Sequence, residues 1–271
     1  MISFGGKLKS FFEPLPSPDV LGAWGVGLAF FGLFAFSAGQ GPFWQDSGEL
    51  TSASFTMGSA HPSGFPLYLM LGKLFGFLPL GSVAFRMNLL SSACAGASLG
   101  LVAKITQEMG AKNGADPLAA RLGGLGAACL LGATLAFWRN ATVAEVYMPT
   151  LLLLSGCLLL FLRAQKHPLS PHNNALALLC GLGVAGLHAT LRLELFLGLA
   201  VAWIWDLRST PSPRKRLSPF FFVLGASVAA YLPLVSSQHP VVDWGHPETL
   251  GRLWDHLNAS RIRRAFSWRI L

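Results

Sequence analysis

Long apolar runs separated by short polar stretches dominate this chain. Seven runs are candidates for membrane-spanning helices, because a helix needs about 20 apolar residues to cross a bilayer. They cover residues 20–38, 85–105, 120–138, 147–162, 174–188, 193–205 and 217–235. The runs 174–188 and 193–205 are short, so they cross only where the bilayer thins or where they meet in a protein-lined cavity. The pattern therefore predicts an all-α, polytopic membrane bundle with about seven crossings.

Two segments need separate interpretation. Residues 65–80 are apolar but contain Pro66, Lys73 and Pro79, so we predict a re-entrant or interfacial helix in the first outer loop. Residues 20–38 resemble a cleaved signal peptide in position, but the run exceeds the about 7–15 apolar residues typical of one. This length favours a retained first helix over a cleaved one.

The pattern divides the chain into a tail, 1–19, a transmembrane domain, 20–236, and an amphipathic segment, 237–271. In the last region we expect Pro247 and Glu248 to open a helix, since proline and an acidic residue are typical of a first turn. Its apolar face would carry residues at helical spacing, namely Leu250, Leu253, Trp254 and Leu257. Such a helix lies on the outer membrane surface or packs against further domains.

Composition supports the membrane assignment. Of the 271 residues, 52 % are hydrophobic and only 12 % are charged, and the mean hydropathy is +0.52. A soluble globular domain carries about 25 % charged residues. Half of that density leaves too few polar side chains to cover a water-facing surface, which excludes a soluble enzyme, a disordered chain and a disulfide-stapled secreted domain.

The net charge of +8 reflects topology and not nucleic-acid binding, because the basic residues lie in short clusters between apolar runs. Basic residues concentrate on one side of the predicted bundle, which is therefore cytoplasmic together with the N-terminus. Eleven lie there: Lys7, Lys9, Lys104, Lys112, Arg121, Arg163, Lys166, Arg208, Arg214, Lys215 and Arg216. Outside the C-terminal segment, only four lie opposite. We expect a multi-pass protein of the inner cell membrane.

Ionisable residues from chain-distant places collect at the outer ends of the predicted helices. They are Asp46, Glu49 and His61 in the first outer loop, Arg86 at the start of the second span, Arg139 and Glu145 in a tight turn, and His188 with Arg192 between the short runs. Charges near hydrocarbon are costly and usually face a functional cavity. We predict that they line one site.

Each of these residues also has a purely structural interpretation. Asp46 could cap a helix that begins near Ser47, and Arg139 could pair with Glu145 across their turn. His188 could be a buried core histidine, and Arg86 could anchor the helix at the interface. Their joint clustering on one side favours the functional interpretation.

The chemistry that suits this set is a reaction on a membrane-borne phosphate. Arginine forms a rigid fork that matches phosphate oxygens and stabilises a phosphate leaving group. A carboxylate opposite can accept the proton of an attacking hydroxyl. If Asp46 begins a helix, Glu49 at i+3 lies on the same face. The spacing predicts no metal site, although a divalent metal requirement and other cofactors remain open.

Several motifs resemble a family of bacterial membrane proteins of formerly unknown function that is related to the transmembrane protein O-mannosyltransferases. The resemblance spans roughly residues 40 to 255. It is carried by Phe43-Trp44-Gln45-Asp46-Ser47-Gly48-Glu49, His61-Pro62-Ser63-Gly64-Phe65-Pro66-Leu67-Tyr68, Phe85-Arg86-Met87-Asn88, Trp138-Arg139-Asn140-Ala141, Ala144-Glu145-Val146-Tyr147, Gly181-Leu182-Gly183 with His188, and Asp243-Trp244-Gly245-His246-Pro247-Glu248-Thr249.

The resemblance implies the C-type glycosyltransferase fold and transfer of a hexose such as mannose from a polyprenyl-phosphate donor. The acceptor is a hydroxyl of a protein or glycan on the outer face. It implies Asp46 as the catalytic base and Glu49 as the second acid of the same motif. His61, Arg86, Arg139, Glu145 and His188 are candidates for substrate binding by position. Relatives usually continue further, so the chain is expected to be truncated at its C-terminus.

Two alternatives remain beside the enzyme. One is a transporter or lipid-handling protein, and the other is an inactive truncated paralogue. A transporter typically places polar groups near the midplane on paired, broken helices. Here the polar groups gather at one face and no internal repeat is visible, which favours the enzyme.

Overall fold

The computed structural model describes residues 18–166, 171–186 and 217–260, together with Ile204, Ile262 and Arg264. Within these residues all regular elements are helices, and the single β-bridge joins Ser59 to Asp243. The predicted all-α class is thus confirmed for the described part of the chain. Residues 1–17, the predicted run 193–205 apart from Ile204, and the candidate residues His188 and Arg192 lie outside it.

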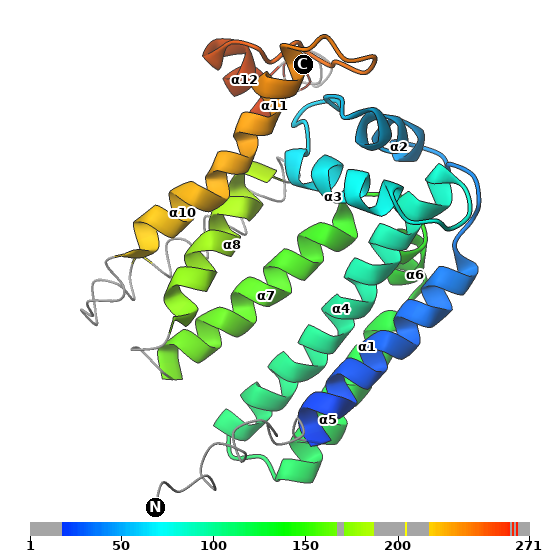
Figure 1. Ribbon diagram of the computed structural model, residues 1–271. Coiled ribbons are helices and arrows are strands. Elements are labelled where there is room, and N and C mark those ends of the chain that lie inside the picture. The colour runs from blue at the N-terminus through cyan, green and yellow to red at the C-terminus, as the bar shows by residue number, and fades with distance from the viewer. Residues whose placement is uncertain are drawn as a thin grey trace, which may run out of the picture.

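Long helices run side by side to form the bundle (Figure 1). They are α1 (Pro18–Ser37), α4 (Val83–Lys112), α5 (Pro117–Gly132), α7 (Tyr147–Lys166), α8 (His172–Gly186) and α10 (Ser218–Ala226), which continues through η2 (Ser227–Ala230) into α11 (Tyr231–Ser236). Four stretches are long and apolar enough to cross a membrane, namely 19–37, 83–112, 147–166 and 218–236. A fifth follows if α5 and the next helix form one bent span. The described residues therefore support four or five crossings, and the predicted seven remain a prediction.

The predicted span 120–138 is not one continuous helix. Helix α5 ends at Gly132, and α6 (Leu135–Ala141) departs from it at an angle of 73°. The break lies at Thr134, whose hydroxyl accepts a hydrogen bond from the backbone N–H of Phe137 and so caps a new helix. The bend carries Arg139 and Asn140 across the end of the bundle.

Close helix packing in the bundle depends on small residues, as the Gly181–Gly186 stretch suggests. A Cβ on Gly181 would lie 2.1 Å from the backbone oxygen of Phe222, and one on Gly225 would lie 2.2 Å from that of Leu178. Helices α8 and α10 therefore touch backbone to backbone, a contact that only glycine permits.

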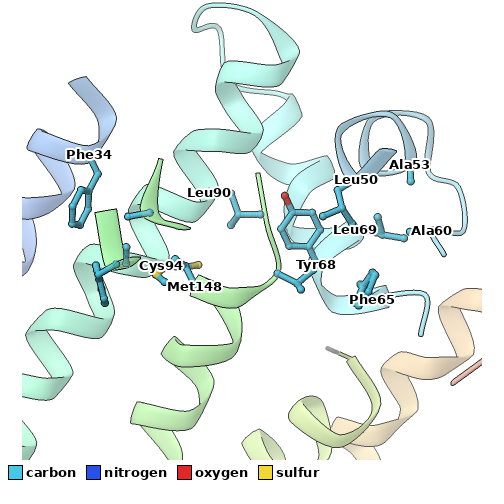
Figure 2. Close-up of a cluster of buried hydrophobic side chains, with 14 of the residues drawn as sticks. Phe34, Leu50, Ala53, Ala60, Phe65, Tyr68, Leu69, Leu90, Cys94 and Met148 are labelled. Atoms are coloured by element: carbon cyan, nitrogen blue, oxygen red, sulfur yellow. The ribbon is translucent and has the colours of Figure 1, made fainter. Parts of the chain in front are cut away.

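Three short helices cover one end of the bundle, and we call this end the head: α2 (Ser47–Thr56), α3 (Pro66–Gly76) and α12 (Leu250–Leu257). Helix α3 forms within the apolar stretch 65–80 and ends before Pro79. The core of the head contains Leu50, Phe65, Tyr68 and Leu69, which are fully buried (Figure 2). The head begins where α1 ends, at the pole opposite the start of α1.

The C-terminal part of the described chain folds back onto the head. Helix α12 begins at Leu250, later than the predicted opening at Pro247, because the hydroxyl of Thr249 caps it by accepting from the N–H of Arg252. Leu253 and Leu257 pack on the core, whereas Leu250 and Trp254 are exposed. The predicted apolar face is therefore divided between the core and the surface.

Candidate active site

Asp46 occupies the N-cap position of α2, where an aspartate commonly accepts backbone hydrogen bonds. Its side chain makes no capping hydrogen bond, and 52 % of the side chain is exposed. The structural interpretation of Asp46 as a helix cap therefore does not describe this carboxylate. It is available to a substrate.

Glu49 lies in the first turn of α2 and His61 lies in the loop before α3. The backbone N–H of His61 donates to Oε1 of Glu49 at 2.6 Å, and Nδ1 of His61 lies 3.1 Å from Oε2 of Glu49. On the other side of the ring, Nε2 lies 3.7 Å from Oδ2 of Asp46. The imidazole therefore joins both carboxylates, and we call Asp46, Glu49 and His61 the α2 cluster.

This arrangement stabilises the charged forms of Glu49 and His61. Burial alone would raise the pKa of Glu49, but the side-chain and backbone hydrogen bonds from His61 outweigh it and lower that pKa. Burial alone would lower the pKa of His61, but its hydrogen bond to Glu49 and the charges of Glu49 and Asp46 raise it. The pair thus favours an imidazolium between two carboxylates.

Glu145 approaches the α2 cluster from the loop between α6 and α7. Its pKa is raised to about 7, chiefly by burial and further by the negative charge of Asp46, although backbone hydrogen bonds at Val146 and Asp46 oppose the shift. Asn88 on α4 fixes this loop, because its Oδ1 accepts from the N–H of Ala144 at 2.8 Å and its Nδ2 donates to the carbonyl of Gly39 at 2.9 Å. A carboxyl group that titrates near neutral pH is typical of a functional site.

A cavity of about 600 Å³ opens beside these residues. Gln45, which precedes Asp46, lines it together with Asn88, Arg139, Glu145 and Tyr147. Arg139 is exposed, and among the described residues no ion pair joins it to Glu145, the partner suggested by the structural interpretation. The cavity therefore combines an exposed guanidinium with a buried carboxyl group.

The structure does not bring every predicted residue to this place. Arg86 donates from Nη1 to the carbonyl of Gly76 at 2.8 Å, from Nε to that of Leu80 at 2.8 Å and from Nη2 to that of Gly81 at 3.2 Å. It holds the turn after α3 and does not line the cavity. Five of the eight predicted residues come together, Arg86 stands apart, and His188 and Arg192 lie outside the described residues.

Tyr68 is the residue that the sequence did not single out. It is fully buried between Leu50, Leu69 and Leu90 (Figure 2), and its hydroxyl has no hydrogen-bond partner among the described residues. Burial raises its pKa, and the charge of Glu145 adds to the shift, so the hydroxyl lies near the site. Its place in the His61–Tyr68 motif was the only available signal.

Chemically, the site offers a base, a set of carboxylates and a cation. The side chains of the α2 cluster each provide one ligand atom within 4.8 Å of the others, so they could hold a divalent metal. Asp46 can accept a proton, and Arg139 can bind a phosphate across the cavity. These are the groups that transfer from a phosphate-linked donor requires.

Comparison with known proteins shows the family to which this chain belongs. The model of the protein O-mannosyl-transferase TMEM260 N-terminal domain matches residues 46–212, which is more than half of the chain. The chain belongs to this family. The relationship to O-mannosyltransferases that its motifs predict is thereby confirmed, and the match begins at Asp46.

A curated relative supports the same assignment. Mouse protein O-mannosyl-transferase TMEM260 is 27 % identical over 222 residues, which cover 78 % of this chain and 30 % of the relative. The chain thus spans about a third of the length of that relative. No solved structure matches this chain. Together with the apolar helices, membership in this family identifies an integral membrane protein.

Proposed function

We propose that the chain is a membrane glycosyltransferase that moves a hexose, such as mannose, from a polyprenyl-phosphate donor to a hydroxyl group of a protein or glycan. Asp46 accepts the proton of the acceptor hydroxyl, whose oxygen then attacks the anomeric carbon of the donor sugar. The bond from that carbon to the phosphate oxygen breaks, and polyprenyl phosphate leaves with the bonding electrons. Arg139 stabilises the negative charge on the departing phosphate.

The observation that carries this proposal is the uncapped Asp46 carboxylate, which acts on Glu145, next to a cavity lined by Glu145 and Arg139. A general base must be ionised and free to reach substrate, and a capping aspartate is not free. Glu49 and His61 act as positioning residues, since their hydrogen bond fixes the imidazole beside Asp46.

The position of the site favours an enzyme over a transporter. Asp46, Glu49, His61 and Glu145 lie at the end of the bundle, in or next to the head. A transporter binds its substrate near the bilayer midplane on broken helices. A lipid-linked donor instead presents its phosphate at the membrane surface, where this site would meet it.

We further propose that the head faces the outer side of the membrane, with the N-terminus in the cytoplasm, since the basic loops gather at the opposite pole. The test uses Val241→Cys in the head and Lys112→Cys at the opposite pole, each in a chain without its native cysteines. Both positions are exposed. An impermeant thiol reagent on intact cells should label position 241 and not position 112. The reverse pattern would overturn the orientation.

The decisive assay measures hexose transfer from a polyprenyl-phosphate donor by the purified chain in detergent. Asp46→Asn removes the proton acceptor and keeps the shape. Asp116→Asn is the matched control, because Asp116 also precedes a helix but does cap it, accepting from the N–H groups of Leu118 and Ala119, and asparagine caps equally well. Transfer should fall only in the first variant, and equal transfer in both would refute Asp46 as the base.

A further inference from the structure

A second group of chemically similar side chains lies in the head, away from the cavity. Asp243, His246 and Glu248 each offer one ligand atom, and these atoms lie within 4.8 Å of one another. Nδ1 of His246 lies 2.8 Å from Oδ2 of Asp243, and Nδ1 of a further histidine, His239, lies 3.7 Å from Oε1 of Glu248. We call Asp243, His246 and Glu248 the 243–248 cluster.

The carboxylate of Asp243 is buried and only partly hydrogen-bonded among the described residues. Only 6 % of this side chain is exposed. Oδ2 accepts a hydrogen bond from the hydroxyl of Ser236 at 3.0 Å and faces His246, but Oδ1 is buried and has no hydrogen-bond partner among the described residues. A buried carboxylate oxygen without a donor is costly, and such groups are usually paired or bind a metal. Proximity of the three residues alone would not point to a ligand, but the burial of this incompletely paired carboxylate beside them does.

We propose that the 243–248 cluster binds a divalent transition-metal ion of the Zn²⁺ type. The ion takes the place of the proton that His246 shares with Asp243, and it neutralises the two carboxylates that face each other. Ser236 orients the Asp243 carboxylate from behind, as outer partners of metal ligands commonly do. This site is separate from the proposed transferase site and does not depend on it.

The donor set decides between classes of cation. Calcium and magnesium prefer oxygen ligands throughout, whereas zinc and similar ions accept imidazole nitrogen together with carboxylate oxygen. Here the ligand atoms of one histidine and two carboxylates converge, and His239 lies beside Glu248 without belonging to this group. Because His246 is 63 % and Glu248 is 31 % exposed, the ion can enter from solvent.

The site lies on a loop that is hydrogen-bonded to the segment before His61. The N–H of Ser59 donates to the carbonyl of Val242 at 2.8 Å, and the N–H of Trp244 donates to that of Ser59 at 3.0 Å. Asp243 lies between these two bonds. Metal binding therefore fixes the loop that pairs with residue 59, two positions before His61.

The test uses the full chain, purified in detergent, stripped with a chelator and titrated with Zn²⁺, with Co²⁺ absorption as a second readout. His246→Ala and Glu248→Gln remove exposed ligands, which protects folding. Asp255→Asn in the same segment is the matched control, and Glu49→Gln removes the competing α2 cluster. Losing a ligand should raise the Kd by at least about tenfold to a hundredfold, since even outer partners cost that much. The Kd should stay unchanged in Asp255→Asn and in Glu49→Gln.

A second measurement follows thermal unfolding. Zn²⁺ should raise the Tm of the wild-type chain, because an ion that binds only the folded state stabilises it, and this rise should vanish in the double variant His246→Ala with Glu248→Gln. Three results would each overturn the proposal: no Zn²⁺ binding by the stripped chain, an unchanged Kd in the double variant, or loss of binding only in Glu49→Gln. None of them bears on sugar transfer, so the two proposals fail separately.

Discussion

The α2 cluster and the 243–248 cluster contain the same three residue types, aspartate, glutamate and histidine, but differ in what surrounds them. In the α2 cluster the histidine contacts both carboxylates, Asp46 is half exposed, and a cavity of about 600 Å³ with Arg139 lies beside it. In the 243–248 cluster the aspartate is the buried member and the histidine is exposed. An exposed aspartate next to a cavity can act on a substrate, whereas a buried one with an unpaired oxygen is suited to hold an ion. Burial and neighbours, and not residue type, decide the chemistry.

The largest effect should separate the two aspartates. Asp46→Asn should reduce sugar transfer by about 10²–10⁴-fold, which is the usual contribution of a positioned base. Its stability should change little, since the side chain caps nothing. Asp243→Asn should instead cost about 1.5–3 kcal/mol of stability, because it weakens hydrogen bonds to a charged group. Transfer rates and thermal unfolding of both variants provide the measurement, and the comparison fails if Asp46→Asn unfolds as readily as Asp243→Asn.

The next effect concerns the two arginines. Arg139→Lys should weaken donor binding by roughly tenfold to a hundredfold, because lysine cannot reproduce a bidentate contact with phosphate. Arg86→Lys serves as the matched control and should leave donor affinity intact. It should lower the free energy of unfolding by about 1.5–3 kcal/mol, because the guanidinium of Arg86 donates to three backbone carbonyls. Binding of a polyprenyl-phosphate donor and the Tm are measured for each. Equal donor affinity in both variants would remove Arg139 from the site.

A smaller effect should distinguish two buried polar side chains near Glu145. Asn88→Ala leaves the N–H of Ala144 and the carbonyl of Gly39 unpaired, which should cost about 1–3 kcal/mol. Tyr68→Phe removes a buried hydroxyl without a partner, so stability should be unchanged or slightly higher. Denaturant unfolding measures both. If Tyr68→Phe proves as destabilising as Asn88→Ala, its hydroxyl has a partner in the folded protein.

The smallest effect is a pH dependence of donor binding. Glu145 has a pKa of about 7, so it is neutral below that pH and gains a negative charge above it. A charge in the cavity repels the donor phosphate, and affinity should therefore fall roughly threefold to tenfold as the pH rises from about 6 to about 8. Glu145→Gln stays neutral and should flatten the profile. A wild-type profile that is already flat would show that Glu145 does not face the donor.

The sequence predicts most of the bundle because burial in lipid selects apolar residues along a whole helix. The predicted runs begin within two residues of α1, α4 and α7. The break between α5 and α6 escaped prediction, because Thr134 lies in an apolar stretch, although its hydroxyl caps α6 there. A hydrophobicity pattern does not report such a bond.

The site was predictable where its parts are local. Asp46 and Glu49 share one helix face at i and i+3. The position of His61 between them depends on a loop fold that no local pattern specifies, and the burial of Asp243 depends on packing between distant segments. The sequence also did not reveal that Arg86 would find backbone carbonyls close to its own helix and so remain apart from the cavity.

The loop that carries His61 is held in place by hydrogen bonds with residues 231–256. The carbonyl of Gly58 accepts from the hydroxyl of Tyr231, the hydroxyl of Ser59 donates to the carbonyl of Trp244, and the carbonyl of Ala60 contacts the His256 ring, across separations of 173 to 196 residues. A ribosome that adds about 5–20 residues per second needs roughly 10–40 s to make that length. The α2 cluster is therefore synthesised early, and its loop can form these contacts only after residues 231–256 have been made.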